Sequence, residues 1–453
     1  MKTNTFRHVA ALLLLSLTTI GLQAQNTAKK APASFGKTIK GSDFNPCVST
    51  DYEAYLKQKN PNRLSGEQFE QWLAPKVAAA KLARNGQNTN TVVTVPVVVH
   101  IIHNGDALGV NENIADEQVL SQIQVLNQDF RNMQDTPGYS DNPAAADIEI
   151  EFCMAQRDPQ GNLTNGIDRV NLGKASWGST AVETVLKPQT IWNPEEYLNI
   201  WVCNFGGDLY GVGGYAFFPE GANIEGLEGA ESNEDNDGLT IWYKVFGSSD
   251  IYPEGNYLEG HDKGRSTTHE MGHFLGLRHI WGDGNSCDNT DYCADTPTAL
   301  AMNMTCSEID SCPESDGFDM IENHMDYTPD ACKHFFTNDQ KARMVAVLQN
   351  APRRIALQAS TACTAPELGL DDTLKNGTGI YPNPAKDVLY ITSNITGVQG
   401  SYTIFNALGQ AVASKNIQFD AQVAINVEGL NKGIYFIKIS REGKTSTLKF
   451  IKD

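Results

Sequence analysis

The segment HEMGHFLGLRH, residues 269 to 279, constrains this chain more than any other part of its sequence. His269 and His273 are four residues apart, so on an α-helix both imidazoles leave one face a single turn apart and can bind one metal ion. His279 would point away from them on the same helix, and Gly276 lies between with the freedom to turn the chain back. The segment therefore predicts a helix, a glycine turn and a metal site with three histidines.

Three imidazoles with one open coordination position are typical of catalytic zinc, which lowers the pKa of a bound water and polarises a carbonyl group. Glu270 follows the first histidine and is placed to accept a proton from that water. Two plainer interpretations exist, because helix-face histidines are commonly solvated and Thr267-x-x-Glu270 also fits a capping box. The combination of three histidines, a glutamate and a glycine at fixed spacing favours the metal site.

The motif resembles the extended zinc motif of the metzincin endopeptidases, and NHMDYTPDAC at residues 323 to 332 resembles their methionine turn, with Met325 as the methionine. HIWGD, DTP, MDYT and FTNDQKARM follow in the order seen in the pappalysin family, in particular in its ulilysin- and mirolysin-like members. VPVVVHIIHN, QIQVLNQDFRN and YLNIWVCNFGG extend the resemblance to roughly residues 90 to 350. It implies an α+β metzincin-type catalytic domain, with a twisted mixed sheet and an active-site helix, and a zinc-dependent endopeptidase.

The resemblance also implies roles for two further residues. Tyr327 is expected to stabilise the oxyanion of the tetrahedral intermediate as a phenol donor, with a core aromatic as the alternative. Asp330 is expected in the pocket for the residue after the scissile bond, where a carboxylate favours arginine or lysine; a plain surface aspartate is the alternative. Pro329 replaces an acid of those relatives, so we expect a narrower or weaker preference for basic residues.

Residues 1 to 24 are predicted to be a secretory signal, because Lys2 and Arg7 precede an apolar stretch of 14 residues from Val9 to Leu22, too short to span a membrane. Residues 25 to 84 are polar and helix-prone, and are predicted to be a pro-segment with a short helix at FEQWLAPKVAAAKLA and an exposed linker after it.

Cys47 in the predicted pro-segment could occupy the open zinc position and keep the precursor latent, because thiolate sulfur binds zinc well. An ordinary cysteine is the alternative, in which case Asp43 or Asp51 becomes the candidate. Activation by cleavage at Ala80-Lys81 or Ala83-Arg84 is predicted.

Nine cysteines in an exported chain suggest disulfides, and the odd number leaves at least one cysteine unpaired or otherwise engaged. The resemblance implies the pairs Cys287–Cys312 and Cys306–Cys332, which leaves four cysteines unassigned: Cys153, Cys203, Cys293 and Cys363. The same loop carries oxygen ligands that suit calcium, and the resemblance favours a structural calcium over solvated acids. These candidate ligands are Asp288, Asp291, Asp295 and Thr296.

Residues 85 to 363 are predicted to be the catalytic domain and residues 364 to 379 a linker. Short alternating runs in residues 380 to 453 predict a small all-β sandwich. YPNPAKDVLYI, FNALGQ and GIYFIKISREGKTSTLKFIK resemble the C-terminal sorting domain of proteins exported by the type IX secretion system of Bacteroidota. A carbohydrate- or matrix-binding module is the alternative.

A formal net charge of -19 argues against nucleic acid or an anionic membrane as a partner. The prediction is a secreted or cell-surface zinc endopeptidase, made as a latent zymogen, that acts on proteins or peptides and uses the type IX secretion machinery. A catalytically inert, zinc-stabilised adhesin and a zinc amidase acting on small substrates are the alternatives. No transmembrane segment is expected.

Overall fold

The computed structural model describes residues 34–36, 39, 42–84, 92–221, 234–315, 317–366, 378–393, 397–406, 409–441 and 444–453. The predicted signal segment lies outside these residues. Among the helices that are described, none has the length and apolar character needed to cross a membrane.

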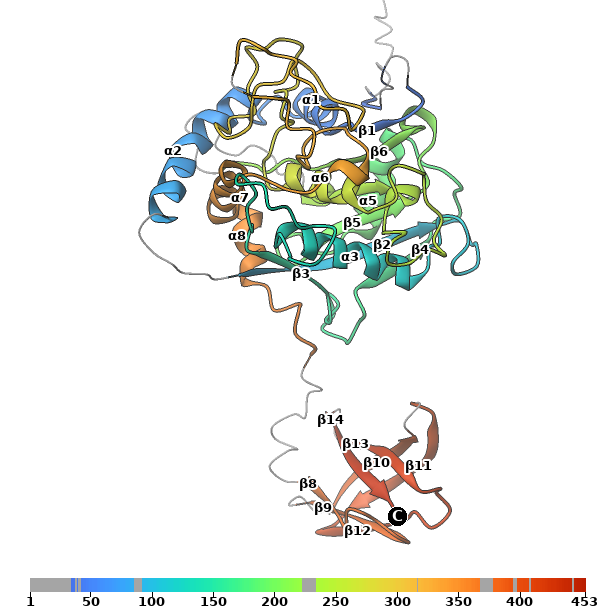
Figure 1. The fold of residues 1–453 in the computed structure, drawn as a ribbon. Helices are drawn as coiled ribbons and strands as arrows, with labels where there is room; N and C mark the ends of the chain where they lie inside the picture. Colours follow the sequence, from blue (N-terminus) through green and yellow to red (C-terminus); the bar gives the residue numbers. More distant parts are fainter. Residues whose placement is uncertain are drawn as a thin grey trace, which may run out of the picture.

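A seven-stranded mixed sheet forms the centre of the N-terminal part of the molecule (Figure 1). Its strand β2 (Val93–His103) is rich in valine and isoleucine. Val95 to Ile102 are all buried, as expected for a strand covered on both faces. All neighbours are parallel except β6 and β7. The strand order is β1 (Asn45–Cys47), β6 (Val212–Ala216), β7 (Leu239–Trp242), β5 (Leu198–Cys203), β2 (Val93–His103) and β3 (Ile150–Met154), with β4 (Ile167–Asn171) also paired to β2.

Two helices, α3 (Asp116–Phe130) and α6 (Arg265–Phe274), pack against each other and against the sheet. The apolar side chains of α3 are buried except for Leu120, which is 50% exposed because it follows the buried Val119 by one residue and points to the outer side. The other helical elements before the linker are α4 (Ser179–Ala181), η1 (Val182–Leu186), α5 (Lys187–Thr190), η2 (Gly207–Leu209), η3 (Glu234–Asn236), η4 (Tyr243–Val245), η5 (Asp330–Cys332), α7 (Asn338–Asn350) and α8 (Pro352–Ala359).

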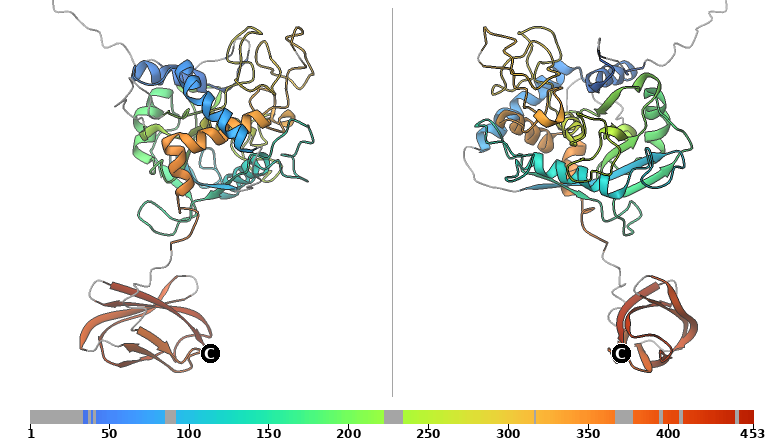
Figure 2. Two further views of the ribbon diagram at one scale, coloured as in Figure 1. Left: turned by 90° about the vertical axis from the view of Figure 1, so that its left-hand side faces the viewer. Right: turned by 45° about the vertical axis from the view of Figure 1, so that its right-hand side comes forward.

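The predicted pro-segment is more regular than its sequence suggested. It contributes β1 to the edge of the sheet and two helices, α1 (Ser49–Lys59) and α2 (Gly66–Arg84). The predicted short helix is in fact 19 residues long, with Pro75 inside it, and it packs along α7 (Figure 2). In the run DGLTIWYKVF only Leu239–Trp242 is extended, and a short helical turn follows it.

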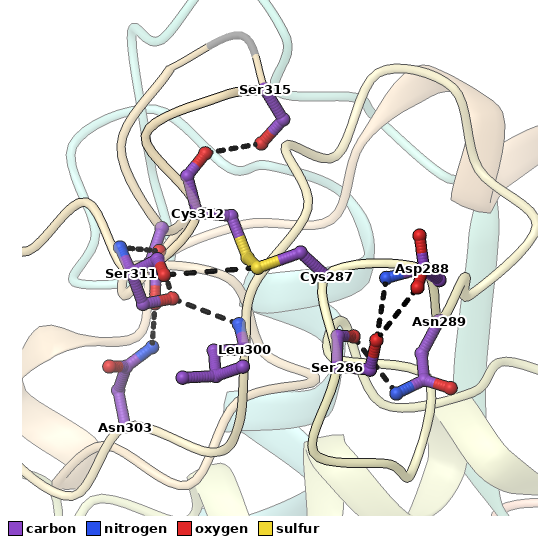
Figure 3. The surroundings of a disulfide bond; sticks show 10 residues. Ser286, Cys287, Asp288, Asn289, Leu300, Asn303, Ser311, Cys312 and Ser315 are labelled. Carbon is purple, nitrogen blue, oxygen red and sulfur yellow. Dashed lines mark hydrogen bonds between the residues drawn. A yellow bond between two sulfur atoms is a disulfide. The ribbon is translucent and has the colours of Figure 1, made fainter.

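Between α6 and η5, the described part of the chain contains no helix or extended strand. Disulfides Cys287–Cys312 and Cys306–Cys332 hold this long loop, with the pairing that the resemblance implied. Around the first bridge, Leu300 donates its backbone N–H to the hydroxyl of Ser311 (Figure 3). A third bridge, Cys153–Cys363, joins β3 to the segment after α8; Cys47, Cys203 and Cys293 are free and buried.

The C-terminal part is an all-β unit of two sheets around its own core, as predicted. Leu389 and Ile391 of one sheet pack with Ile437 and Ile439 of the other. The run SYTIFNALGQAV belongs to two strands rather than one. The sheets are β11 (Ala411–Phe419), β10 (Val398–Asn406), β13 (Gly433–Arg441) and β14 (Lys444–Lys452), and β12 (Gln422–Asn426), β9 (Val388–Ser393) and β8 (Thr378–Tyr381).

Candidate active site

Helix α6 and the turn that ends it bring the motif histidines together. His269 and His273 lie one turn apart on α6, and Gly276 follows with φ of 86°. The N–H groups of Gly276 and Leu277 donate to the carbonyls of His273 and Gly272 and close the helix. A side chain at Gly276 would be strained by this φ and would meet Val347 Cγ2 at 2.8 Å. The turn leads the chain back, so that His279 faces the helix.

All three imidazoles are buried and have fixed orientations. Nδ1 of His269 donates to the carbonyl of His324 at 2.8 Å, Nδ1 of His273 donates to that of Leu277 at 2.8 Å, and Nδ1 of His279 donates to the carboxylate of Asp283. The other ring nitrogens therefore carry lone pairs.

These three lone pairs converge on one point. Nε2 of His279 lies 3.2 Å from Nε2 of His269 and 3.0 Å from Nε2 of His273. Burial, reinforced by the neighbouring imidazoles, lowers the pKa of His269, and burial lowers that of His273 to about 3, so both rings are neutral. Converging lone pairs repel unless a cation lies between them, and the donor set suits zinc.

The pro-segment supplies a fourth ligand atom to this cluster. Cys47 Sγ and the three imidazole nitrogens all lie within 4.8 Å of one another. The backbone oxygen of Cys47 also accepts a hydrogen bond from the phenol of Tyr327 at 2.8 Å. Three nitrogens and one sulfur are donor atoms that zinc accepts in a four-coordinate site.

Glu270 is fully buried beside the histidines, and burial raises its pKa to about 8. Its Oε2 accepts a hydrogen bond of 2.7 Å from the hydroxyl of Ser49, which in turn accepts one from the N–H of Ala216. The capping-box interpretation is wrong, because α6 begins at Arg265 and the hydroxyl of Thr267 donates to the side chain of Gln122. Glu270 therefore lies beside the histidines and is hydrogen-bonded to a residue of the predicted pro-segment.

Met325 and Tyr327 lie beside the histidines of the site. A side chain at Gly272 would meet the sulfur of Met325 at 2.4 Å, so the methionine turn touches α6 between the two histidines of the helix. The Tyr327 ring lies 5.6 Å from His269 and 4.9 Å from His279, measured between ring centroids. The hydroxyl of Tyr327 donates to the carbonyl of Cys47 beside the histidines, so this ring is more than a core aromatic.

Asp330 is buried, with 2% of its surface exposed, so the alternative of a plain surface aspartate is wrong. Its Oδ2 accepts the N–H groups of Lys263 and Arg265 at 3.0 and 3.2 Å, at the start of α6. Its Oδ1 has no hydrogen-bond partner among the described residues. Asp330 therefore contacts the backbone at Arg265, which lies about one helical turn before His269 on α6.

Of the four candidate calcium ligands, two lie together. Asp291 and Thr296 line one polar pocket, and the hydroxyl of Thr296 lies 2.9 Å from both carboxylate oxygens of Asp291. Asp288 is exposed and does not line this pocket, nor does Asp295, whose Oδ2 accepts the N–H of Asp339. Calcium in this loop stays a prediction.

Three residues that complete the site were missed in the sequence. Asp283 orients His279, Ser49 binds Glu270, and Thr50 donates to Asp283 at 3.0 Å. Asp283 stands four residues after the third histidine, which was a usable signal. Ser49 and Glu270 are 221 residues apart, and no local pattern connects them.

Comparison with known proteins agrees with this geometry. Residues 183–349 match the family described as Pregnancy-associated plasma protein-A, and residues 379–453 match the Secretion system C-terminal sorting domain. An extracellular metalloprotease of Verticillium alfalfae is 30% identical over 275 residues, which are 59% of this chain and 82% of that protein. One from Arthroderma benhamiae is 28% identical over 274 residues, or 60% of this chain and 81% of that protein.

Two solved structures from Tannerella forsythia are also similar. Mature mirolysin in complex with a cleaved peptide is 39% identical, with a TM-score of 0.50, over 59% of this chain and 96% of that chain. A promirolysin mutant is 36% identical, with a TM-score of 0.52, over 65% of this chain and 93% of that chain.

The fold and the site define the metzincin class of zinc metalloendopeptidases. Within that class the chain belongs to the pappalysin family, the family of pregnancy-associated plasma protein-A. The protein is a secreted enzyme, and its C-terminal sorting domain directs export through the secretion machinery of Bacteroidota.

Proposed function

We propose that His269, His273 and His279 hold the catalytic zinc through their Nε2 atoms and that Glu270 is the general base of peptide hydrolysis. The convergence of three Nε2 lone pairs, each turned inward by an Nδ1 hydrogen bond, carries this proposal. Their partners, two backbone carbonyls and Asp283, keep the rings in that orientation through turnover.

When bound, zinc supplies Lewis acidity that activates a water molecule and polarises the scissile carbonyl. Glu270 accepts the proton of the attacking water at a carboxylate oxygen and then delivers it to the leaving amine. Tyr327 donates its phenol hydrogen to the developing oxyanion, a contact now made with the carbonyl of Cys47. Both roles require that the pro-segment has left.

The test is the Glu270→Ala variant of the activated enzyme. We expect zinc content to stay near one per chain, because Glu270 is not a ligand, while kcat on a peptide substrate falls about 10²- to 10⁴-fold, the usual contribution of a general base. Glu322→Ala, at a glutamate outside the site, is the control and should retain full activity. Unchanged hydrolysis in Glu270→Ala would remove the residue from the mechanism.

We also propose that Cys47 is the latency switch. A thiolate in the fourth coordination position excludes the water on which Glu270 acts, so a folded, metal-loaded precursor is inactive. Cleavage after residue 80 or 83 would release the segment. Cleavage at Ala83-Arg84 needs less unwinding than cleavage at Ala80-Lys81, because it lies at the end of α2. Cleavage at Ala80-Lys81 would also disturb the ion pair of Lys81 with Asp339, whose charged atoms lie 2.7 Å apart.

Cleavage before arginine or lysine is the remaining part of the proposal, and it rests on the carboxylate of Asp330. An unpaired carboxylate in the pocket for the residue after the scissile bond would attract a basic side chain. How strongly it does so depends on the other charges that face Oδ1 of Asp330.

A further inference from the structure

Helix α1 of the predicted pro-segment carries an anchor of its own, three residues after Ser49. Tyr52 is completely buried, and its phenol donates a hydrogen bond of 2.5 Å to Oε2 of Glu183. The other carboxylate oxygen, Oε1, accepts a hydrogen bond of 2.7 Å from the phenol of Tyr215 in β6. Helix α1 lies beside that strand (Figure 1). One glutamate therefore joins a tyrosine of the pro-segment to a tyrosine of the catalytic part.

A buried ammonium completes this site. Nζ of Lys187 lies 2.7 Å from Oε1 of Glu183, and the two side chains are 0% and 4% exposed. The same ammonium lies 4.9 Å from the ring centroid of Tyr52, 4.7 Å from that of Tyr215 and 5.2 Å from that of Trp201. An ammonium is attracted to the faces of aromatic rings, most strongly where water is excluded. We call Glu183, Lys187, Trp201 and Tyr215 the tyrosine site, because Tyr52 fills it.

Further rings extend the contact between the pro-segment and the catalytic part. Phe35 lies 4.9 Å from both Tyr52 and Tyr215 and 5.1 Å from Tyr55, measured between ring centroids. These three rings of the pro-segment are buried and share one apolar core with Tyr215 and Phe217. Buried aromatic rings contribute strongly to association. The contact does not depend on the peptide bonds near residue 83, so it can form again after the chain is cut there.

The tyrosine site and the zinc-binding histidines lie on opposite faces of the sheet. A side chain at Gly214 of β6 would meet Cγ of Glu270 at 3.2 Å, so Gly214 faces α6. Side chains alternate along a strand, and the next residue, Tyr215, therefore points to the other face. Tyr52 is thus bound by groups other than those assigned to zinc and to catalysis.

We propose that the tyrosine site is a binding site of the mature enzyme for a tyrosine-bearing peptide segment, and that its ligand is the released pro-segment. A phenol fits because it donates to Glu183 while its ring faces the ammonium of Lys187. Cleavage allows the segment to leave, and this site makes its departure reversible. On rebinding, α1 returns Ser49 to Glu270 and Cys47 to the histidines. The released segment is therefore an inhibitor, and part of its affinity is independent of the thiol. This inference rests on the proposed latency.

Tyr52 and Tyr55 form a matched pair for the test. Both are buried tyrosines of α1 whose rings contact Phe35. The hydroxyl of Tyr52 binds the carboxylate of Glu183, whereas that of Tyr55 forms no hydrogen bond within the described parts of the chain. A hydrogen bond to a buried charged group changes an equilibrium constant about tenfold or more. Only Tyr52→Phe should therefore weaken binding of the segment.

The test uses the Glu270→Ala precursor, which cannot digest itself, trimmed by a trace of active enzyme. Size-exclusion chromatography at falling protein concentration measures the Kd between the segment and the rest of the chain, and mass spectrometry identifies both parts. We expect the segment to stay bound at micromolar concentration, and to do so with Cys47→Ala in the same background. Tyr52→Phe should raise the Kd at least tenfold, and Tyr55→Phe should leave it unchanged. Helix α2 is present in every variant, so the comparison isolates the tyrosine site.

Peptide hydrolysis provides the second measurement. The specific activity of trimmed wild-type enzyme should rise on dilution, because the segment dissociates. With Tyr52→Phe the rise should occur at a protein concentration about tenfold higher. Equal Kd values for Tyr52→Phe and Tyr55→Phe, or a segment that separates at every concentration, would overturn the inference. A full-length precursor as active as the trimmed enzyme would instead contradict the proposed latency.

Discussion

Three residues of the predicted pro-segment, Cys47, Ser49 and Thr50, contact the groups that we assign to the active site. Cys47 faces the three imidazoles, and its carbonyl binds Tyr327. Ser49 binds Glu270, and Thr50 donates to Asp283 and so reaches His279 through it. The latency that we propose would therefore be distributed over these residues.

Replacing the sulfur should separate these contributions. We expect the Cys47→Ala precursor, still full length, to hydrolyse a peptide at least tenfold faster than the parent precursor, because water can enter the fourth position. Activity should stay below that of the mature enzyme, since Ser49 and the backbone of Cys47 still bind Glu270 and Tyr327. Initial rates, with mass spectrometry of the intact chain, measure this.

Cys203→Ala is the control, because Cys203 is also free and buried but lies in β5, away from the histidines. It should remain latent. If Cys47→Ala is as latent as the parent, the sulfur is not the switch, and Asp43 or Asp51 becomes the better candidate.

At the scale of elements, α2 attaches the predicted pro-segment to the rest of the molecule away from the three histidines. Phe69 and Leu73 of α2 pack on Phe218 and Val347. Beside this apolar contact, Glu70 accepts two hydrogen bonds of 2.6 Å from Arg343 of α7. It also accepts one of 2.9 Å from Arg278, just after the glycine turn. Helix α2 thereby contacts both the turn that follows α6 and helix α7.

Breaking this ion pair should loosen the precursor. Glu70→Gln leaves Arg343 buried without its countercharge, which costs about 3–5 kcal/mol for pairs of this kind. We expect a lower melting temperature of the precursor and faster trimming by added active enzyme. Glu67→Gln, one turn earlier and bonded only to Gln71 of the same helix, should change neither measurement. Equal trimming rates for the two variants would show that α2 does not control activation.

At the scale of the whole molecule, the hydrophobic cores of the described residues fall into two groups along the chain. The C-terminal core consists of side chains between Ala385 and Phe450, and the other cores lie at or before Ala362. The disulfide Cys153–Cys363 closes the catalytic part just before the linker.

Separate cores predict separable functions. A chain ending at residue 366 keeps Cys363 and should match the full-length protein in peptide hydrolysis and in the unfolding temperature of the catalytic part. It should not be exported from a host with the type IX machinery, because the sorting domain is absent. Full-length Glu270→Ala is the control and should still be exported. Export of the shortened chain would assign the sorting signal elsewhere.

Local sequence determined the elements whose geometry depends on near neighbours. Helical spacing puts His269 and His273 on one face, and a glycine allows the left-handed turn to His279, so the metal cluster could be predicted. The continuous apolar residues of β2 are typical of a buried strand, and alternation predicted the C-terminal strands. The sequence motifs also indicated the family to which the chain belongs.

Tertiary structure decided every contact between distant segments. The bridge Cys153–Cys363 spans 210 residues, and the hydrogen bond between Ser49 and Glu270 spans 221. Neither pair has a periodic signal, because packing of the sheet brings the partners together. Lys333 is only three residues from Asp330, yet the turn of η5 decides that their charges face each other. Spacing along the chain therefore predicted which groups bind the metal, and only packing determined which charges surround it.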